Sequence, residues 1–296
     1  MGAYDTTVGV LLLGLFFNTF LYGIVCVQFL TYKNHKFNDA LWIKAIVAAL
    51  FVVDTVHSAV SIYAGWQMAV TNFDNPSSLA IVSWTIPFTA VATAFAAILT
   101  QAFMSHRVYK LTASKPAVIV IGIFSAVGFV FGTYAGIRSG IIAEVKNFGV
   151  LKPFVICWLG SQTVADLLLT CILIYAFARS KTGFRKTDSV INRLIRGSIQ
   201  TGLFVSIFAL GDLFTFTLHG NTNLYAMFAY PIGRIYTNTL LDTLNSRIAL
   251  KTIAYTETEE KSGAAPGDFR MHTQSQTYAE NNKSDGKFNV ETASQV

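Results

Sequence analysis

The feature that most limits the possible folds of this chain is a series of apolar runs, each about as long as a lipid bilayer is thick. A helix rises 1.5 Å per residue, so about 20 apolar residues cross a hydrocarbon layer of about 30 Å. Backbone groups in lipid need partners within their own segment, and the runs lack the alternation of barrel strands. We therefore predict an all-α, polytopic bundle of seven transmembrane helices. The runs are residues 8–30, 43–64, 82–104, 117–138, 153–178, 198–218 and 225–246.

The composition agrees with a membrane protein. Only 13% of the 296 residues are charged and 53% are hydrophobic, whereas a soluble domain carries about 25% charged residues. This balance excludes a disordered chain and an ordinary cytosolic enzyme. The net charge of +6 fits loops that set membrane orientation better than nucleic-acid binding. We expect the lipid bilayer as a partner, no nucleic acid, and a location in the plasma membrane or another membrane of the secretory pathway.

Basic residues are concentrated after the first, third, fifth and seventh runs. Cytoplasmic loops are enriched in Lys and Arg, so the pattern predicts an external N-terminus and a cytosolic C-terminus. The residues on the predicted cytosolic side are Lys33, Lys36, Lys44, Arg107, Lys110, Lys115, Arg179, Lys181, Arg185, Lys186, Arg193, Arg196, Arg247 and Lys251.

Two segments outside the runs have their own character. Residues 252–296 are rich in Thr, Ser, Asn, Glu and Gly, so we predict a disordered cytosolic tail after a bundle formed by residues 1–251. The basic loop 179–196 is suited to anionic headgroups or to a cytosolic partner. Within this loop, the sequence Thr187-Asp188-Ser189 offers an N-cap for a helix that continues unbroken to residue 218.

Four acidic residues lie inside the apolar runs: Asp54, Asp166, Asp212 and Asp242. A charged side chain at membrane depth costs roughly 2.5–3.5 kcal/mol on insertion scales, so each needs a partner or a purpose. Simple pairing cannot neutralise all four, because only Arg234 and His57 oppose them. We therefore expect some of these acids to face a wet cavity or to hold a proton.

Asp54 and His57 are three residues apart and share one helix face. A carboxylate that orients an imidazole can relay protons, and such a pair can equally tie helices together or form half of a metal site. No second histidine lies in a run, except His219 at an edge. We therefore predict no metal and no cofactor.

The seventh run carries a polar stripe. Arg234, Asn238, Asp242 and Asn245 follow one another at i, i+4, i+8 and i+11, which places them along one side of a helix. Arg234 and Asp212 lie at similar depths below the same membrane face, so we predict that they pair. The candidate ligand-binding or polar-core residues are Asp54, His57, Asp166, Asp212, Arg234, Asn238 and Asp242.

The chain resembles an uncharacterised family of fungal integral membrane proteins that carry a C-terminal domain of unknown function. The likeness covers roughly residues 8–250. It implies a seven-helix fold in a membrane and supplies no activity or catalytic residues. The matching stretches are Asn18-Thr19-Phe20-Leu21-Tyr22-Gly23, Asp54-Thr55-Val56-His57, the segment from Lys181 to Gln200, Tyr236-Thr237-Asn238-Thr239-Leu240-Leu241 and Asn245-Ser246-Arg247.

Three functions remain open. A receptor-like protein with a polar interior site for a small molecule fits the seven runs, the external N-terminus and the basic loop 179–196. A proton- or cation-coupled transporter of small molecules fits the surplus acids. A membrane-embedded enzyme would use the intramembrane aspartates as acid or base. A central pocket that opens only outward favours the receptor. A polar path that reaches both faces favours transport, and a lipid-accessible cavity with converging acids favours catalysis.

Overall fold

The computed structural model describes residues 5–35, 37–75, 81–142, 144–181, 185–218 and 223–248. Within these ranges the chain forms seven α-helices, and its only β pairing is a single bridge between Ile81 and Glu144. The predicted disorder of 252–296 lies outside the described residues. The helices are α1 (Val10–Asn34), α2 (Leu41–Trp66), α3 (Thr85–Thr112), α4 (Lys115–Ile142), α5 (Lys152–Arg179), α6 (Arg185–Leu218) and α7 (Leu224–Asn245), with the short helical turns η1 (Asp5–Gly9), η2 (Gln67–Thr71) and η4 (Val145–Leu151).

Six of the seven α-helices in the described part of the chain are long and apolar enough to cross a membrane. The chain is therefore an integral membrane protein, as its sequence predicts. The exception is α7, which is interrupted by Arg234, Asn238 and Asp242. Its 22 residues nevertheless extend about 33 Å at the helical rise, which matches the thickness of the hydrocarbon layer.

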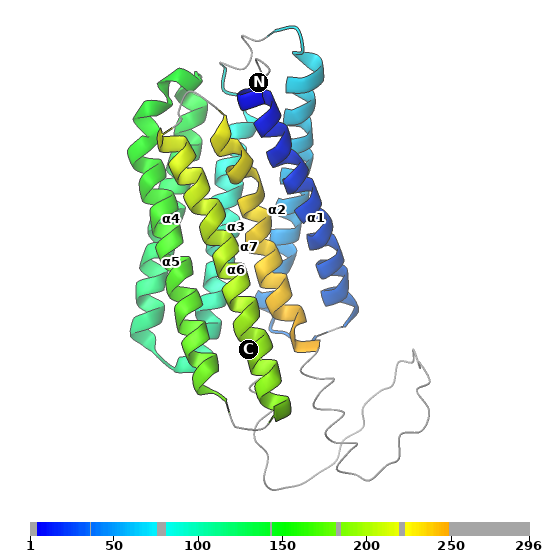
Figure 1. Cartoon of the computed structure of the whole chain (residues 1–296), viewed down its shortest axis with the longest axis vertical. Helices are drawn as coiled ribbons and strands as arrows, with labels where there is room; N and C mark the ends of the chain where they lie inside the picture. The colour runs from blue at the N-terminus through cyan, green and yellow to red at the C-terminus, as the bar shows by residue number, and fades with distance from the viewer. Residues whose placement is uncertain are drawn as a thin grey trace, which may run out of the picture. The chain divides into compact units, whose positions relative to one another are not determined.

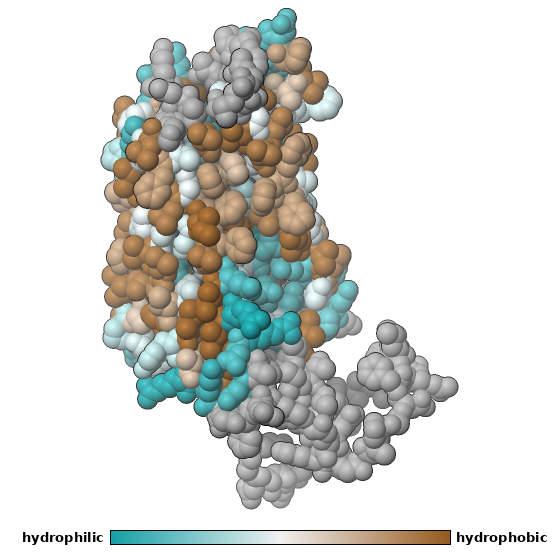
Figure 2. Space-filling model, in the orientation of Figure 1, coloured by the Kyte–Doolittle hydropathy of each residue, from teal (hydrophilic) through white to brown (hydrophobic). Residues whose placement is uncertain are grey.

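Large apolar side chains cover the outside of the bundle. Phe16 and Phe20 on α1 are each 66% exposed, and Ile137 on α4 is 57% exposed. In Figure 2, apolar residues form a broad brown surface over most of the visible face, and hydrophilic residues gather in its lower part. A soluble monomer rarely exposes apolar patches of this extent, so we assign this surface to lipid contact.

Helix α7 occupies the middle of the bundle. It packs against α1, α2, α3 and α6, whereas α4 packs mainly against α3 and α5 (Figure 1). The helix whose apolar run carries the most polar residues thus has four helical neighbours. Its polar side chains can find partners there, whereas a helix facing lipid could offer them none.

Small residues let α4 approach its two neighbours. An added Cβ at Gly132 would lie 2.6 Å from the indole nitrogen of Trp158 on α5, and one at Gly128 would lie 2.8 Å from Gln162. Gly136, one turn further on, approaches Pro87 and Ala90 on α3 in the same way. Close backbone contact through glycine is a usual means of helix association in membranes. Lipid tails are as apolar as the side chains, so no hydrophobic driving force favours contact between helices over contact with lipid.

Helix α6 is unbroken over 34 residues, so the predicted continuous helix into the sixth run is confirmed. The predicted N-cap at Thr187, Asp188 and Ser189 is wrong, because the helix already begins at Arg185. The basic residues at the start of α6 therefore belong to the helix and not to the loop before it.

Gly14 of α1 is expected to be intolerant of a larger residue. A Cβ at this position would lie 2.8 Å from the backbone oxygen of Ala226 and 2.9 Å from Cα of Met227, both on α7. Backbone atoms cannot rotate away, so Gly14→Ala should lose about 1–3 kcal/mol through overpacking. At Gly23, on the same helix, no atom lies within 4 Å of the added Cβ. Gly23→Ala should instead gain about 0.5–1 kcal/mol. Thermal unfolding in detergent measures the stability of both variants. Equal melting temperatures for Gly14→Ala and Gly23→Ala would contradict the α1–α7 packing.

Candidate functional site

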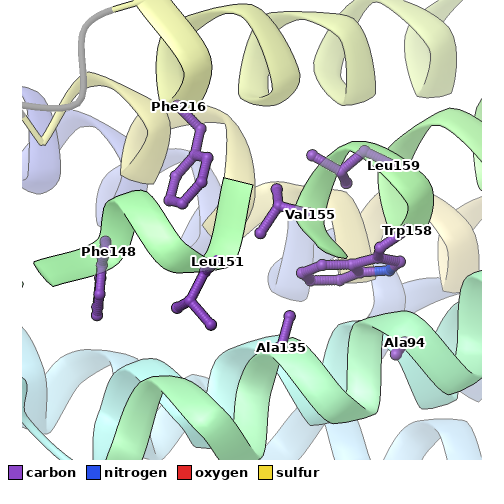
Figure 3. Close-up of a cluster of buried hydrophobic side chains, with 8 residues drawn as sticks. All are labelled: Ala94, Ala135, Phe148, Leu151, Val155, Trp158, Leu159 and Phe216. Carbon is purple, nitrogen blue, oxygen red and sulfur yellow. The ribbon is translucent and has the colours of Figure 1, made fainter. Parts of the chain in front are cut away.

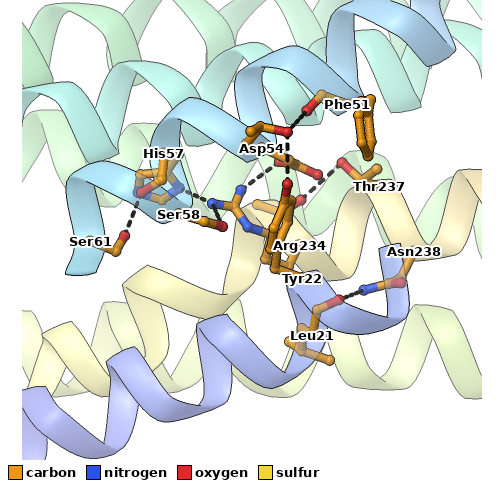
Figure 4. A network of polar contacts seen from close by, with 12 residues as sticks. Leu21, Tyr22, Phe51, Asp54, His57, Ser58, Ser61, Arg234, Thr237 and Asn238 are labelled. Carbon is orange, nitrogen blue, oxygen red and sulfur yellow. Dashed lines mark hydrogen bonds and ion pairs between the residues drawn. The ribbon is translucent and has the colours of Figure 1, made fainter. Parts of the chain in front are cut away.

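Arg234 is buried at the centre of the bundle, with only 1% of its surface exposed. Its Nη1 donates to Asp54 Oδ1 at 2.5 Å, and its Nη2 donates to His57 Nδ1 at 2.8 Å and to Ser58 Oγ at 3.2 Å (Figure 4). The three acceptors share one face of α2 because they are spaced at i, i+3 and i+4. One guanidinium thus joins α7 to α2 by an ion pair and two further hydrogen bonds.

The protonation of His57 follows from its partners. A guanidinium can only donate, so His57 Nδ1 must accept from Arg234, and the proton of a neutral imidazole then lies on Nε2. His57 Nε2 lies 3.0 Å from Thr89 Oγ1, which itself donates to the backbone oxygen of Thr85 at 2.8 Å. The hydrogen bonds therefore run from α7 through α2 to α3.

The predicted pair of Arg234 with Asp212 is wrong. Arg234 makes its ion pair with Asp54, and the Asp212 carboxylate makes no hydrogen bond or ion pair with a described residue. Matching depth fixes only the position along the helix axes. The direction in which each side chain leaves its helix decides the contact, and Arg234 is directed toward α2. Asp54 and His57 do share one face as predicted, but the guanidinium lies between helices to contact both of them, in place of a direct carboxylate–imidazole bond.

Asp166 of α5 forms a second buried group. Its Oδ1 accepts from Gln101 Nε2 of α3 at 2.9 Å, and its Oδ2 accepts from Tyr236 Oη of α7 at 2.6 Å. All three side chains are at most 7% exposed. Each carboxylate oxygen has one neutral donor, so Asp166 joins α3, α5 and α7 with no ion pair to a described residue.

The polar stripe predicted on α7 serves several neighbours. Asn238 and Asn245 donate to the backbone oxygens of Leu21 and Gln28 on α1, at 3.2 and 2.9 Å. Asp242 is exposed. It faces α6, because a Cβ added at Gly197 would lie 3.9 Å from Asp242 Oδ2. Residues at i and i+4 differ by about 40° around a helix, so a stripe of this length drifts from one neighbour to another.

Four residues of these groups were not among the predicted site residues. Ser58 could have been found, because it lies one turn after Asp54 on the face that carries His57. Tyr236 could not, because it lies two positions after Arg234 and leaves α7 on a different side. Gln101 and Thr89 are polar residues in an apolar run, and the sequence gives no direction for either. The four are Ser58, Thr89, Gln101 and Tyr236.

A cavity of about 40 Å³ borders the Asp166 group. Its wall includes Gln101, Asp166 and Tyr236, together with Ser198 and Thr201 of α6. A single water needs about 10–15 Å³ of such volume, so this cavity has room for two or three waters beside several polar side chains. We refer to it as the small cavity.

A second cavity of about 120 Å³, which we call the large cavity, lies near the beginning of α1, α3, α5 and α7 and the end of α4 and α6. Most of its wall is apolar, and several wall residues belong to the buried cluster in Figure 3. Asp212, 5% exposed, is the only charged residue among the described residues of the wall. The wall is Leu11, Ile86, Thr89, Ala90, Thr93, Ala135, Ser139, Val145, Phe148, Leu151, Val155, Trp158, Asp212, Phe216, Asn223, Tyr225, Ala226, Ala229 and Tyr230.

The polar groups lie between the two cavities along α7. Tyr230 and Thr89 line the large cavity, and Thr89 is bonded to His57. Arg234 comes one turn after Tyr230, and Tyr236 then lines the small cavity. Hydrogen bonds among Thr89, His57 and Arg234, followed by helix α7 as far as Tyr236, thus lie between the two cavities.

Metal binding finds no support in the described side chains, where no group of three His, Cys, Asp or Glu could hold an ion. The four aspartates also lie in separate surroundings: Asp54 beside Arg234, Asp166 beside Tyr236, Asp212 in the large cavity and Asp242 facing α6. None of them shares a hydrogen-bond partner with another in these contacts.

Comparison with known proteins gives one match. Residues 162–249 match the model of DUF6534, a family of unknown function, which agrees with the expected domain of unknown function in the C-terminal part. The matched region includes α6, α7 and Asp166, but it begins after α2, which supplies Asp54. No curated protein and no solved structure matches the chain.

Proposed function

We propose that this protein is a receptor-like seven-helix membrane protein in which the large cavity holds a small molecule and α7 transmits its presence to the opposite end of the bundle. The observation that carries this proposal is the placement of the cavity at one end, separated from the small cavity by the hydrogen-bonded groups of Arg234 and Asp166.

The proposal includes a membrane crossing by α7. Its most polar side chains have partners inside the bundle, since Arg234 binds Asp54 and the amides of Asn238 and Asn245 donate to α1. Satisfied polar groups that face other helices are compatible with a transmembrane segment, whereas the same groups facing lipid are not. With the basic residues as guide, the large cavity lies on the outer side and the C-terminus in the cytosol.

Two alternatives have less support. A transporter needs a path that opens to both faces in turn, and the small cavity is the one feature that favours it. An enzyme would need acids that converge on one point, whereas Asp54, Asp166 and Asp212 lie in separate surroundings. The basic start of α6 remains a proposed contact for a cytosolic partner, and the plasma membrane or another secretory-pathway membrane remains the proposed location.

Cysteine accessibility separates a receptor from a transporter. In a background lacking Cys26, Cys157 and Cys171, Ala229→Cys places a thiol in the wall of the large cavity and Ser198→Cys places one in the wall of the small cavity. A charged, membrane-impermeant methanethiosulfonate is applied to intact cells and to inside-out vesicles. If the protein is a receptor, the thiol at position 229 should react only from the side at which α1 begins. The thiol at position 198 should react only from the other side.

The contrary result is equally defined. Reaction of the thiol at position 229 from both sides would indicate alternating access and would overturn the receptor proposal in favour of transport. Val130→Cys, on the exposed face of α4, is the matched control, because a thiol facing lipid should react from neither side.

A further inference from the structure

The large cavity contains a buried acid with no partner. Asp212 lies in its wall and is 5% exposed, and its carboxylate forms no hydrogen bond or ion pair with a described residue. None of the described wall residues is Lys, Arg or His. A buried carboxylate without an opposite charge is strongly disfavoured, so a group bound in the cavity that supplies this charge would be held firmly.

Aromatic side chains surround the same space. Phe148, Trp158, Phe216, Tyr225 and Tyr230 all line the cavity, and Phe216 lies one turn after Asp212 on α6. The face of an aromatic ring attracts a cation, most strongly where water is excluded. The wall therefore offers an acid for a charge and rings for both the charge and an apolar body.

Further polar atoms in the wall are free to bind. The side-chain oxygen of Thr93 and the indole nitrogen of Trp158 are buried without a hydrogen-bond partner among the described residues.

The size of the cavity limits the ligand. An apolar cavity of about 150 Å³ accepts benzene, so about 120 Å³ limits the apolar body of a ligand to at most one ring or a short aliphatic chain.

We propose that the large cavity binds a small primary amine with a single-ring apolar body, whose ammonium group pairs with the Asp212 carboxylate. This assignment rests on the proposed function, because it names the class of ligand for the same cavity. Arg234 cannot serve as the partner instead, because it is already held by Asp54, His57 and Ser58.

Three probes of nearly equal size test the charge. Benzylamine is a cation at neutral pH, benzyl alcohol is neutral and benzoate is an anion. Their affinities are measured by calorimetry on the full chain in lipid nanodiscs, with empty nanodiscs to subtract partitioning into lipid. We expect benzylamine to bind at least about tenfold more tightly than benzyl alcohol, because a desolvated charge pair is worth more than a neutral contact. Benzoate should show no binding.

Asp212→Asn removes the charge and keeps the shape. The preference for benzylamine should disappear in this variant, while its melting temperature stays equal or rises because an unpaired buried carboxylate has been removed. Asp74→Asn removes the same charge from an exposed position and should keep the full preference.

The outcomes are distinct. Equal affinity for benzylamine and benzyl alcohol in the unaltered protein, binding of none of the probes, or a preference that persists in Asp212→Asn would each overturn the amine assignment. The comparison within the unaltered protein decides the matter even if Asp212→Asn fails to fold. If the amine assignment fails, the accessibility test of the receptor proposal is unaffected. Conversely, access to position 229 from both sides would end the receptor proposal while an amine site could remain.

Discussion

Asp54→Leu is expected to destabilise the bundle by about 3–5 kcal/mol, because it leaves the Arg234 guanidinium buried without a counter-charge. Arg234→Met should have a similar cost, since Asp54 is 0% exposed and loses the one charged partner that it has among the described residues. The double variant should recover most of the loss, because two apolar side chains of similar volume need no partner. Thermal unfolding in detergent gives the four stabilities of a double-mutant cycle.

A matched cycle tests the alternative pair. Asp212→Leu combined with Arg234→Met should give additive effects, since the two side chains share no contact. A strong coupling between positions 212 and 234, or additive effects at 54 and 234, would show that the buried ion pair has been assigned to the wrong helix.

Asp166→Leu is the second substitution with a large expected effect. It deprives Gln101 Nε2 and Tyr236 Oη of their acceptor, and each buried donor left unsatisfied costs about 1–3 kcal/mol. For two donors we expect a total loss of about 2–6 kcal/mol by the same principle. Because Asp166 would be gone, adding Tyr236→Phe to this variant should cost little more, although Tyr236→Phe alone should cost about 1–3 kcal/mol.

The control for this series is Tyr134→Phe. Tyr134 is 45% exposed on α4 and has no hydrogen bond in the described structure, so its hydroxyl should contribute little. If Tyr236→Phe and Tyr134→Phe change the melting temperature equally, the Asp166 group contributes no more than a surface hydroxyl and does not join the three helices.

The sequence was sufficient to predict the positions of the helices and to assign Asp54 and His57 to one helix face. The 1.5 Å rise and the unfavourable transfer of open backbone into lipid determine how long an apolar run must be, so the predicted runs agree with α1 to α7 within a few residues at most ends. Asp54 and His57 were assigned correctly to one face because their spacing is local. The start of α6 was placed too late, since the basic residues from Arg185 onward look like a loop by composition.

Contacts between helices could not be predicted in the same way. Arg234 and Asp212 have similar depths by their positions in the predicted runs, but the rotation of α7 about its axis directs the guanidinium to α2. Tyr236 and Asp166 are 70 residues apart, and nothing local in either segment points to the other. The large cavity is also a property of packing, because it depends on how several helix ends leave a space unfilled. Rotation and packing are set by all neighbours together, which a single sequence does not reveal.

We propose that α7, whose apolar run is interrupted by polar residues, nevertheless crosses the membrane because Arg234, Asn238 and Asn245 have partners inside the bundle. The most direct measurement places single cysteines at its two ends, Asn223→Cys and Ser246→Cys, in a cysteine-free background and labels intact cells with an impermeant maleimide. If α7 crosses the membrane, the thiol at position 223 is labelled at once and the thiol at position 246 only after permeabilisation. Labelling of both thiols from the same side would contradict it.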